Sequence, residues 1–146
     1  MTNDMSGHAQ VQEAIERAVL SVGATESSFE HRPTEEGDGW VVDWEGKVDG
    51  VAADLSVIGY DGTEEVTFFV DAWLLEGVAK ADIPAVIEAC LGRGARIKKS
   101  GRLFWSGVEL TVPLPAGQYT SSVRNPSDAP LSPWEKRAGE EQRLSA

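Results

Sequence analysis

The stretch from residue 40 to residue 74 constrains the fold more than any other part of the chain. It contains two Asp-Gly dipeptides, Asp49-Gly50 and Asp61-Gly62. This dipeptide suits tight β-hairpin turns, because both central residues of such a turn need a positive φ. Runs of alternating apolar residues flank both dipeptides. The sequence therefore predicts a three-stranded antiparallel meander with strands at 40–48, 51–60 and 65–74.

Two-residue turns at both dipeptides would determine which residues face each other across the strands. The expected partners are all apolar on one face of the sheet. They are Val42–Val57, Trp44–Leu55, Gly46–Ala53 and Val48–Val51 in the first hairpin, and Val57–Val66, Leu55–Phe68, Ala53–Val70 and Val51–Ala72 in the second. A slip of one residue would bury four carboxylates, so the register is strongly specified.

Helical periodicity appears on both sides of the meander. Apolar residues from Val11 to Val22 predict an amphipathic helix at 8–22, and a second stripe predicts a helix at 82–92, with Asp82 as its N-cap and Pro84 in its first turn. We expect an edge strand at 25–32, a linker at 76–80, and two extended segments, 95–99 and 102–114, joined at Ser100-Gly101. The predicted fold is α+β: an antiparallel sheet of about five strands built on the meander, with both helices on one face.

The composition changes after residue 113. Five of the seven prolines lie at 113–133, which is typical of a linker without a core. The sequence Ser132-Pro133-Trp134-Glu135 is a capping box and predicts a short terminal helix that would either dock through Trp134 or stay largely unfolded. We therefore expect one α+β domain at 1–114 and a flexible linker with a short C-terminal helix at 115–146.

The charge of the chain is strongly acidic and unevenly distributed. The net charge is −11, and residues 1–92 hold 19 acidic and 4 basic side chains. Such a chain should be repelled by nucleic acid and by anionic lipid, so we expect neither as a partner. No apolar run is long enough for a membrane span, and the N-terminus has no secretory signal pattern. The single cysteine, Cys90, fits a reducing compartment and a buried position, so we expect a cytoplasmic protein.

The second face of the meander combines acidic and aromatic residues. By the predicted register, two aromatic residues, Phe69 and Trp73, share this face with carboxylates. The candidate partner-binding residues are Phe69, Trp73, Asp43, Glu45, Asp54 and Asp71. Aromatic residues among carboxylates are typical of a docking surface for a basic partner. The alternative is that a loop, the C-terminal tail or a second subunit covers them.

No motif for catalysis, for a cofactor or for a metal site is present. The histidines, His8 and His31, lack partners at the spacing of a triad or a zinc site. Glu45 opposite Asp54 places like charges on one sheet face, but a flat sheet does not provide the cleft of a carboxylate-based enzyme. We therefore expect no catalytic residue, no metal and no cofactor.

One basic run interrupts the acidic chain. It contains Arg93, Arg96, Lys98, Lys99 and Arg102. These residues could bind an anion, or they could contact the acidic face of a second copy of the chain, which favours a homodimer.

The predicted order of elements resembles the secretion-chaperone-like superfamily, the α-β-β-β-α-β-β-α class of bacterial type III secretion chaperones and their relatives. The resemblance covers about residues 8–114. It implies a small, dimeric cytosolic protein that binds another protein in extended form and catalyses nothing, with the dimer contact in the region 86–102.

The leading hypothesis is a non-enzymatic protein-binding module, chaperone-like or adaptor-like, whose partner is basic or partly unfolded. One alternative is an immunity protein or inhibitor of a toxin. Another is a small enzyme or ligand-binding protein with a carboxylate-based site.

Overall fold

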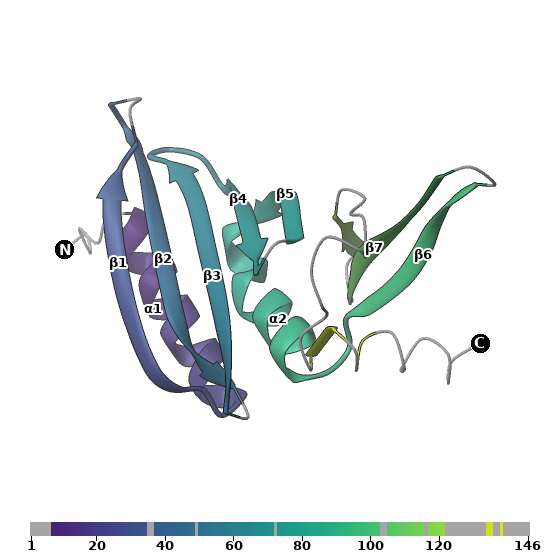
Figure 1. Ribbon diagram of the computed structural model, residues 1–146. Coiled ribbons are helices and arrows are strands. Elements are labelled where there is room, and N and C mark those ends of the chain that lie inside the picture. Colours follow the sequence, from purple (N-terminus) through teal and green to yellow (C-terminus); the bar gives the residue numbers. More distant parts are fainter. Residues whose placement is uncertain are drawn as a thin grey trace.

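The chain folds into two antiparallel sheets and two main helices (Figure 1). The computed structural model describes residues 7–34, 37–48, 50–71, 73–102, 105–115, 117–121, 134–135 and 138. The larger sheet has five strands in chain order, and the smaller one has three. The predicted α+β class is therefore confirmed.

Short connections join most of the helices and strands. The first sheet contains β1 (Thr25–Pro33), β2 (Gly39–Val48), β3 (Val51–Tyr60), β4 (Glu65–Val70) and β5 (Trp73–Ala79). The helical segments are α1 (Gly7–Ser21), the 3₁₀ turn η1 (Lys80–Asp82), α2 (Ile83–Ile87) and the π-helical turn η2 (Glu88–Gly92). The second sheet contains β6 (Arg96–Arg102), β7 (Trp105–Leu114) and β8 (Gly117–Thr120).

Both helices cover the same face of the five-stranded sheet, as predicted (Figure 1). The core there combines the apolar stripe of α1 and that of α2 with Trp44, Leu55 and Phe68, all three of which are almost completely buried. Among the described residues, no helix has both the length and the hydropathy that crossing a bilayer would require.

The first hairpin has the predicted register, with Trp44 opposite Leu55 and Val48 opposite Val51. The predicted register of the second hairpin is wrong by two residues. Leu55 faces Val70, and Val57 faces Phe68. The loop between β3 and β4 is four residues long, and within it the backbone N and the Oγ1 of Thr63 donate to the Tyr60 carbonyl at 3.3 and 2.8 Å. A shift of two residues preserves the face of every side chain, so the apolar partners stay inside.

The third predicted strand is two strands, β4 and β5. The chain turns at Asp71, whose φ of 51° lies in the left-handed region that aspartate tolerates better than most residues. β5 then runs back along β4, which places Trp73 opposite Val70 and Leu74 opposite Phe69. Cross-strand partners share a face, so Trp73 lies on the core face and is only 1 % exposed. The prediction that Trp73 lies on the outer face is therefore wrong.

Several boundaries after the first sheet also differ from the prediction. The expected linker at 76–80 is the end of β5 and the start of η1. Asp82 makes no side-chain cap hydrogen bond; its Oδ2 accepts from the Tyr119 hydroxyl at 2.6 Å instead. The expected connection at Ser100-Gly101 lies within paired strands, because β6 and β7 pair without a break from Arg96 to Arg102.

Part of the predicted linker is structured. Gly117–Thr120 forms β8, which pairs with β7. Farther along, Trp134, Glu135 and Ala138 are buried, so the expected docking through Trp134 is observed. The capping residue Ser132 lies outside the described residues. The division of the chain at residue 114 stays a prediction.

Cys90 lies in η2, is 2 % exposed and belongs to the core, as predicted. Burial, and to a smaller extent the charge of Asp71, raise the pKa of its thiol above the usual range. We expect the native protein to react with dithionitrobenzoate at mildly alkaline pH at least about 100-fold more slowly than the urea-unfolded chain, because only the thiolate attacks the reagent. Absorbance of the released thiolate measures this. Equal rates would show that Cys90 is accessible in the folded protein.

Candidate functional site

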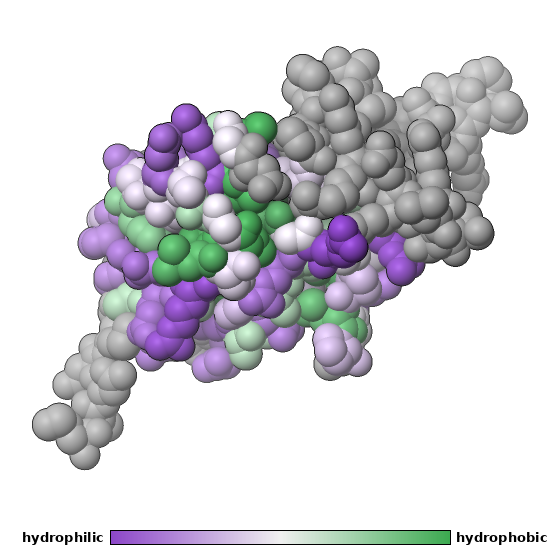
Figure 2. All heavy atoms as spheres, turned by 90° about the horizontal axis from the view of Figure 1, so that it is seen from below, coloured by the Kyte–Doolittle hydropathy of each residue, from purple (hydrophilic) through white to green (hydrophobic). Residues whose placement is uncertain are grey.

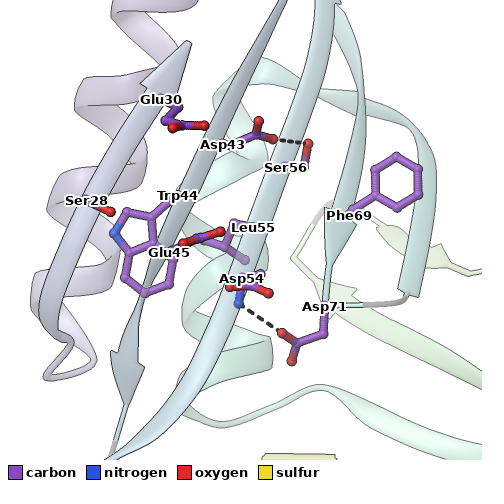
Figure 3. Close-up of a pocket in the computed structure, with 10 residues that line it drawn as sticks. All are labelled: Ser28, Glu30, Asp43, Trp44, Glu45, Asp54, Leu55, Ser56, Phe69 and Asp71. Carbon is purple, nitrogen blue, oxygen red and sulfur yellow. Dashed lines mark hydrogen bonds between the residues drawn. The ribbon is translucent and has the colours of Figure 1, made fainter. Parts of the chain in front are cut away.

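The outer face of the five-stranded sheet holds a shallow pocket with a volume of ≈ 180 Å³ (Figure 3). Two neighbouring rows of cross-strand partners line most of it. One row runs across β1 to β4, and the other runs beside it and ends in the β4–β5 turn. The first row is Glu30, Asp43, Ser56 and Phe69, and the second is Ser28, Glu45, Asp54 and Asp71. Five carboxylates therefore lie around one depression. This group of five residues (Glu30, Asp43, Glu45, Asp54 and Asp71) is called the acidic pocket below.

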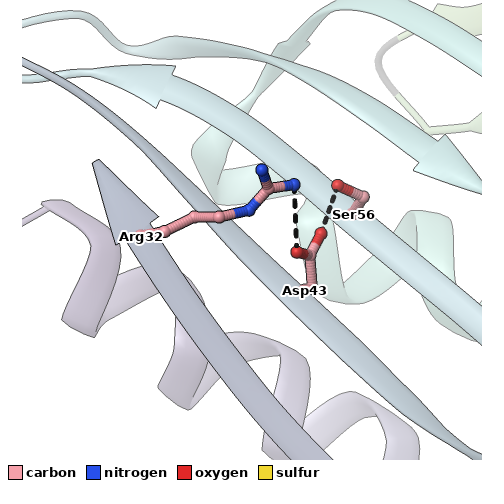
Figure 4. A network of polar contacts seen from close by, with 3 residues as sticks. All are labelled: Arg32, Asp43 and Ser56. Atoms are coloured by element: carbon pink, nitrogen blue, oxygen red, sulfur yellow. Dashed lines mark hydrogen bonds and ion pairs between the residues drawn. The ribbon is translucent and has the colours of Figure 1, made fainter. Parts of the chain in front are cut away.

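Asp43 has a partner on each of its two carboxylate oxygens (Figure 4). Its Oδ1 accepts a hydrogen bond from the Ser56 hydroxyl at 2.7 Å, and its Oδ2 lies 3.4 Å from a guanidinium nitrogen of Arg32. Arg32 is largely exposed, so water screens this ion pair strongly. Ser56 and Arg32 fix the orientation of Asp43 and compensate part of its charge.

Glu45 and Asp54 face each other directly across β2 and β3, and both are exposed. Like charges at directly opposed positions destabilise a sheet. Among the side chains that the structure describes, no cation forms an ion pair with either of them. This pair is therefore the part of the acidic pocket that would gain most from a bound positive charge.

Asp71 closes the β4 end of the pocket and makes three hydrogen bonds, two to Asp54 on β3 and one to Trp134. Its backbone N donates to the Asp54 carbonyl at 2.8 Å, and its Oδ1 accepts from the Asp54 backbone N at 2.9 Å. Its Oδ2 accepts from the indole of Trp134 at 2.7 Å. Burial raises the pKa of Asp71, the two hydrogen bonds oppose this, and the charges of Glu135 and Asp54 add to the increase.

The apolar part of this face is Phe69, which is partly exposed beside the carboxylates. Figure 3 shows Phe69 on β4 at one side of the pocket and Glu30 on β1 at the other. The cross-strand partner of Phe69 on β5 is Leu74, which is also partly exposed. The apolar pair on the outer face is thus Phe69 with Leu74, and not Phe69 with Trp73. Figure 2 shows a limited hydrophobic area among hydrophilic residues on the underside of the molecule.

The residues of the basic run lie apart from this pocket. β6 carries Arg96, Lys98, Lys99 and Arg102, and Arg93 lies just before it. Arg93 and Arg96 are exposed, while only the backbone pairing is described for Lys98, Lys99 and Arg102. β6 and β7 form a long ribbon on the far side of the molecule from β1 (Figure 1). Four of the five residues of the basic run therefore lie on a different sheet from the acidic pocket.

A second depression, ≈ 270 Å³ in volume, contains both histidines. His8 stacks on His31 with ring centroids 5.0 Å apart, and Trp40 lies beside them. Within the described part of the chain, no three His, Cys, Asp or Glu side chains are grouped as a metal-binding set.

Sequence reasoning had placed four of the five carboxylates and Phe69 on one face, and the structure brings them together. It had missed Ser28 and Glu30, although they alternate with the half-buried Phe29 on β1. That alternation was the available signal. It had also missed the contact between Asp71 and Trp134, which joins residues 63 positions apart.

Comparisons with family models, with curated proteins and with solved structures find no match to this chain.

Proposed function

We propose that this chain is a non-enzymatic, chaperone-like or adaptor-like module that binds a basic segment of a partner protein over the acidic pocket. The observation that supports this most directly is the arrangement of the two rows. Five carboxylates surround one depression, a single described cation, Arg32, is paired with them, and the apolar pair Phe69 and Leu74 borders it.

The physical argument is one of complementary charge and shape. A guanidinium or ammonium group between Glu45 and Asp54 would relieve the repulsion between them. An apolar residue of the same segment would cover Phe69 and Leu74, and interfaces favour such a mixture of aromatic and polar contacts. Charges of this kind act mainly on specificity and on the rate of association.

We further propose that the protein acts as a cytoplasmic homodimer. The basic strand β6 offers a charge that complements the acidic pocket of a second copy. A basic partner and a second copy would then compete for the same face.

The test uses a fluorescent synthetic peptide that alternates arginine, serine and leucine, with anisotropy as the measurement. We expect the double variant Glu45→Gln/Asp54→Asn to bind it at least about tenfold more weakly than the unmodified chain, because both charges nearest the predicted cation are removed. Added salt should weaken the binding of the unmodified chain.

The matched control is Glu16→Gln/Asp61→Asn, which makes the same chemical changes at exposed positions on α1 and in the β3–β4 loop. It should bind within about twofold of the unmodified chain. Equal losses in both variants would mean that net charge alone attracts the peptide, and the proposal would then fail. Salt-sensitive dimers without peptide binding would identify a second copy as the occupant. A partner that proves to be a toxin, inactivated on binding, would favour the inhibitor alternative.

A further inference from the structure

The C-terminal residues dock on the first sheet through two hydrogen bonds between indoles and carboxylates. Trp134 Nε1 donates to Asp71 Oδ2 at 2.7 Å, and Trp73 Nε1 donates to Glu135 Oε2 at 2.7 Å. Each side thus supplies one donor and one acceptor. Such a reciprocal pattern specifies one docked position, because a shifted segment would lose both bonds.

The docked residues are also well buried. Trp134, Glu135 and Ala138 are 6 %, 4 % and 3 % exposed. The bond between Trp73 and Glu135 lies in the interior, where a carboxylate that loses its donor costs far more than on the surface. The contact of these three residues with the rest of the protein is therefore a buried interface.

Asp71 belongs both to this interface and to the acidic pocket. Both of its carboxylate oxygens are already committed: Oδ1 accepts from Asp54 and Oδ2 accepts from Trp134. An arginine binds a carboxylate most strongly through both oxygens at once. Each carboxylate oxygen has two acceptor sites, so a guanidinium that binds both oxygens of Asp71 would share Oδ2 with the Trp134 indole and compete with it for the charge of that oxygen.

We propose that residues 134, 135 and 138 form a latch that competes with a cationic occupant of the acidic pocket for the carboxylate of Asp71. This inference rests on the proposed function for the existence of that occupant. In the closed form the Trp134 indole holds Asp71 Oδ2. When a cation enters the pocket and engages Asp71, the hydrogen bond from the Trp134 indole weakens, and the docking of residues 134, 135 and 138 loses one of its two indole–carboxylate contacts. Binding of a partner would in this way release the C-terminal segment.

The experiment combines binding with a direct signal from the latch. The arginine–serine–leucine peptide is titrated into the full chain, and the indole N–H resonances of the tryptophans are followed by ¹H–¹⁵N NMR. We expect the Trp134 resonance to move towards its solvent-exposed position as the peptide binds. We also expect Trp134→Phe, which keeps an aromatic ring but removes the donor, to bind the peptide about tenfold more tightly.

Trp40→Phe is the matched control. It makes the same chemical change in a buried indole whose Nε1 has no hydrogen-bond partner in the described structure, so the peptide affinity should stay within about twofold of that of the unmodified chain. The titration of the unmodified chain requires no substitution and remains decisive even if Trp134→Phe folds poorly.

The outcomes separate the latch from the proposed function. Peptide binding to Trp134→Phe alone would support the latch strongly. Equal affinities of Trp134→Phe and the unmodified chain, with an unmoved Trp134 resonance, would overturn the latch and leave the proposed function intact. Absence of binding in every variant would overturn both.

Discussion

Trp73→Ala is expected to lower the free energy of unfolding by about 3–5 kcal/mol through the cavity it creates in the core. A further loss of about 1–3 kcal/mol should come from Glu135, whose carboxylate is buried and loses the Trp73 indole as a donor. The total is a large part of the 5–15 kcal/mol by which domains are usually stable. Urea denaturation followed by far-ultraviolet circular dichroism measures it.

Trp73→Phe separates the two contributions. It preserves most of the apolar volume and removes the indole donor, so we expect a loss of about 1.5–3 kcal/mol, the range for a hydrogen bond to a charged group. If Trp73→Ala changed the unfolding free energy by less than about 0.5 kcal/mol, as typical surface substitutions do, Trp73 would not lie in the core. That result would restore the outer position that the alternating pattern had predicted.

The first hairpin could be predicted from the sequence because local and long-range signals agree there. Asp49-Gly50 permits a two-residue turn, and that turn places apolar residues opposite each other at every inward position. The second hairpin has the same dipeptide but a four-residue loop, in which Thr63 donates to the Tyr60 carbonyl and one further residue, Glu64, precedes β4. The alternation of apolar residues could not distinguish these registers, since a shift of two residues preserves both faces.

The end of β4 could not be predicted for a different physical reason. Phe69, Asp71 and Trp73 occupy every second position, as residues on one face of a continuous strand do. A single aspartate between them is not a strong signal for a turn. What ends the strand is the left-handed backbone of Asp71, supported by three polar contacts with Asp54 and Trp134. Two of these contacts involve β3, and the third involves a residue near the end of the chain. A turn that depends on tertiary contacts leaves little trace in local sequence.

The acidic pocket was largely predictable, because alternation along β2, β3 and β4 assigns each carboxylate to a face regardless of small register shifts. The contribution of β1 depended on knowing how it pairs with β2. That register includes a shift between Thr25 and Ser28, beside Glu26 with its φ of 52°, and no residue pattern marks this irregularity.

Two adjacent phenylalanines provide the sharpest test of the face assignment. Phe68→Ala is expected to lower the free energy of unfolding by about 3–5 kcal/mol, because Phe68 is completely buried between the sheet and the helices. Phe69→Ala is expected to cost no more than about 1 kcal/mol, because Phe69 lies on the outer face and is only partly covered. Urea denaturation of both variants measures the difference.

The same pair separates stability from binding, because Phe69 borders the acidic pocket and Phe68 does not. Phe69→Ala should bind the arginine–serine–leucine peptide about tenfold more weakly while retaining the circular dichroism of the unmodified chain, since aromatic residues often dominate interface energies. Phe68→Ala, measured where it is still folded, should retain the affinity of the unmodified chain. Similar losses of stability in both variants would contradict the orientation of β4. An unchanged affinity in Phe69→Ala would restrict the binding surface to the carboxylates, and recognition would then depend on charge without an apolar contact.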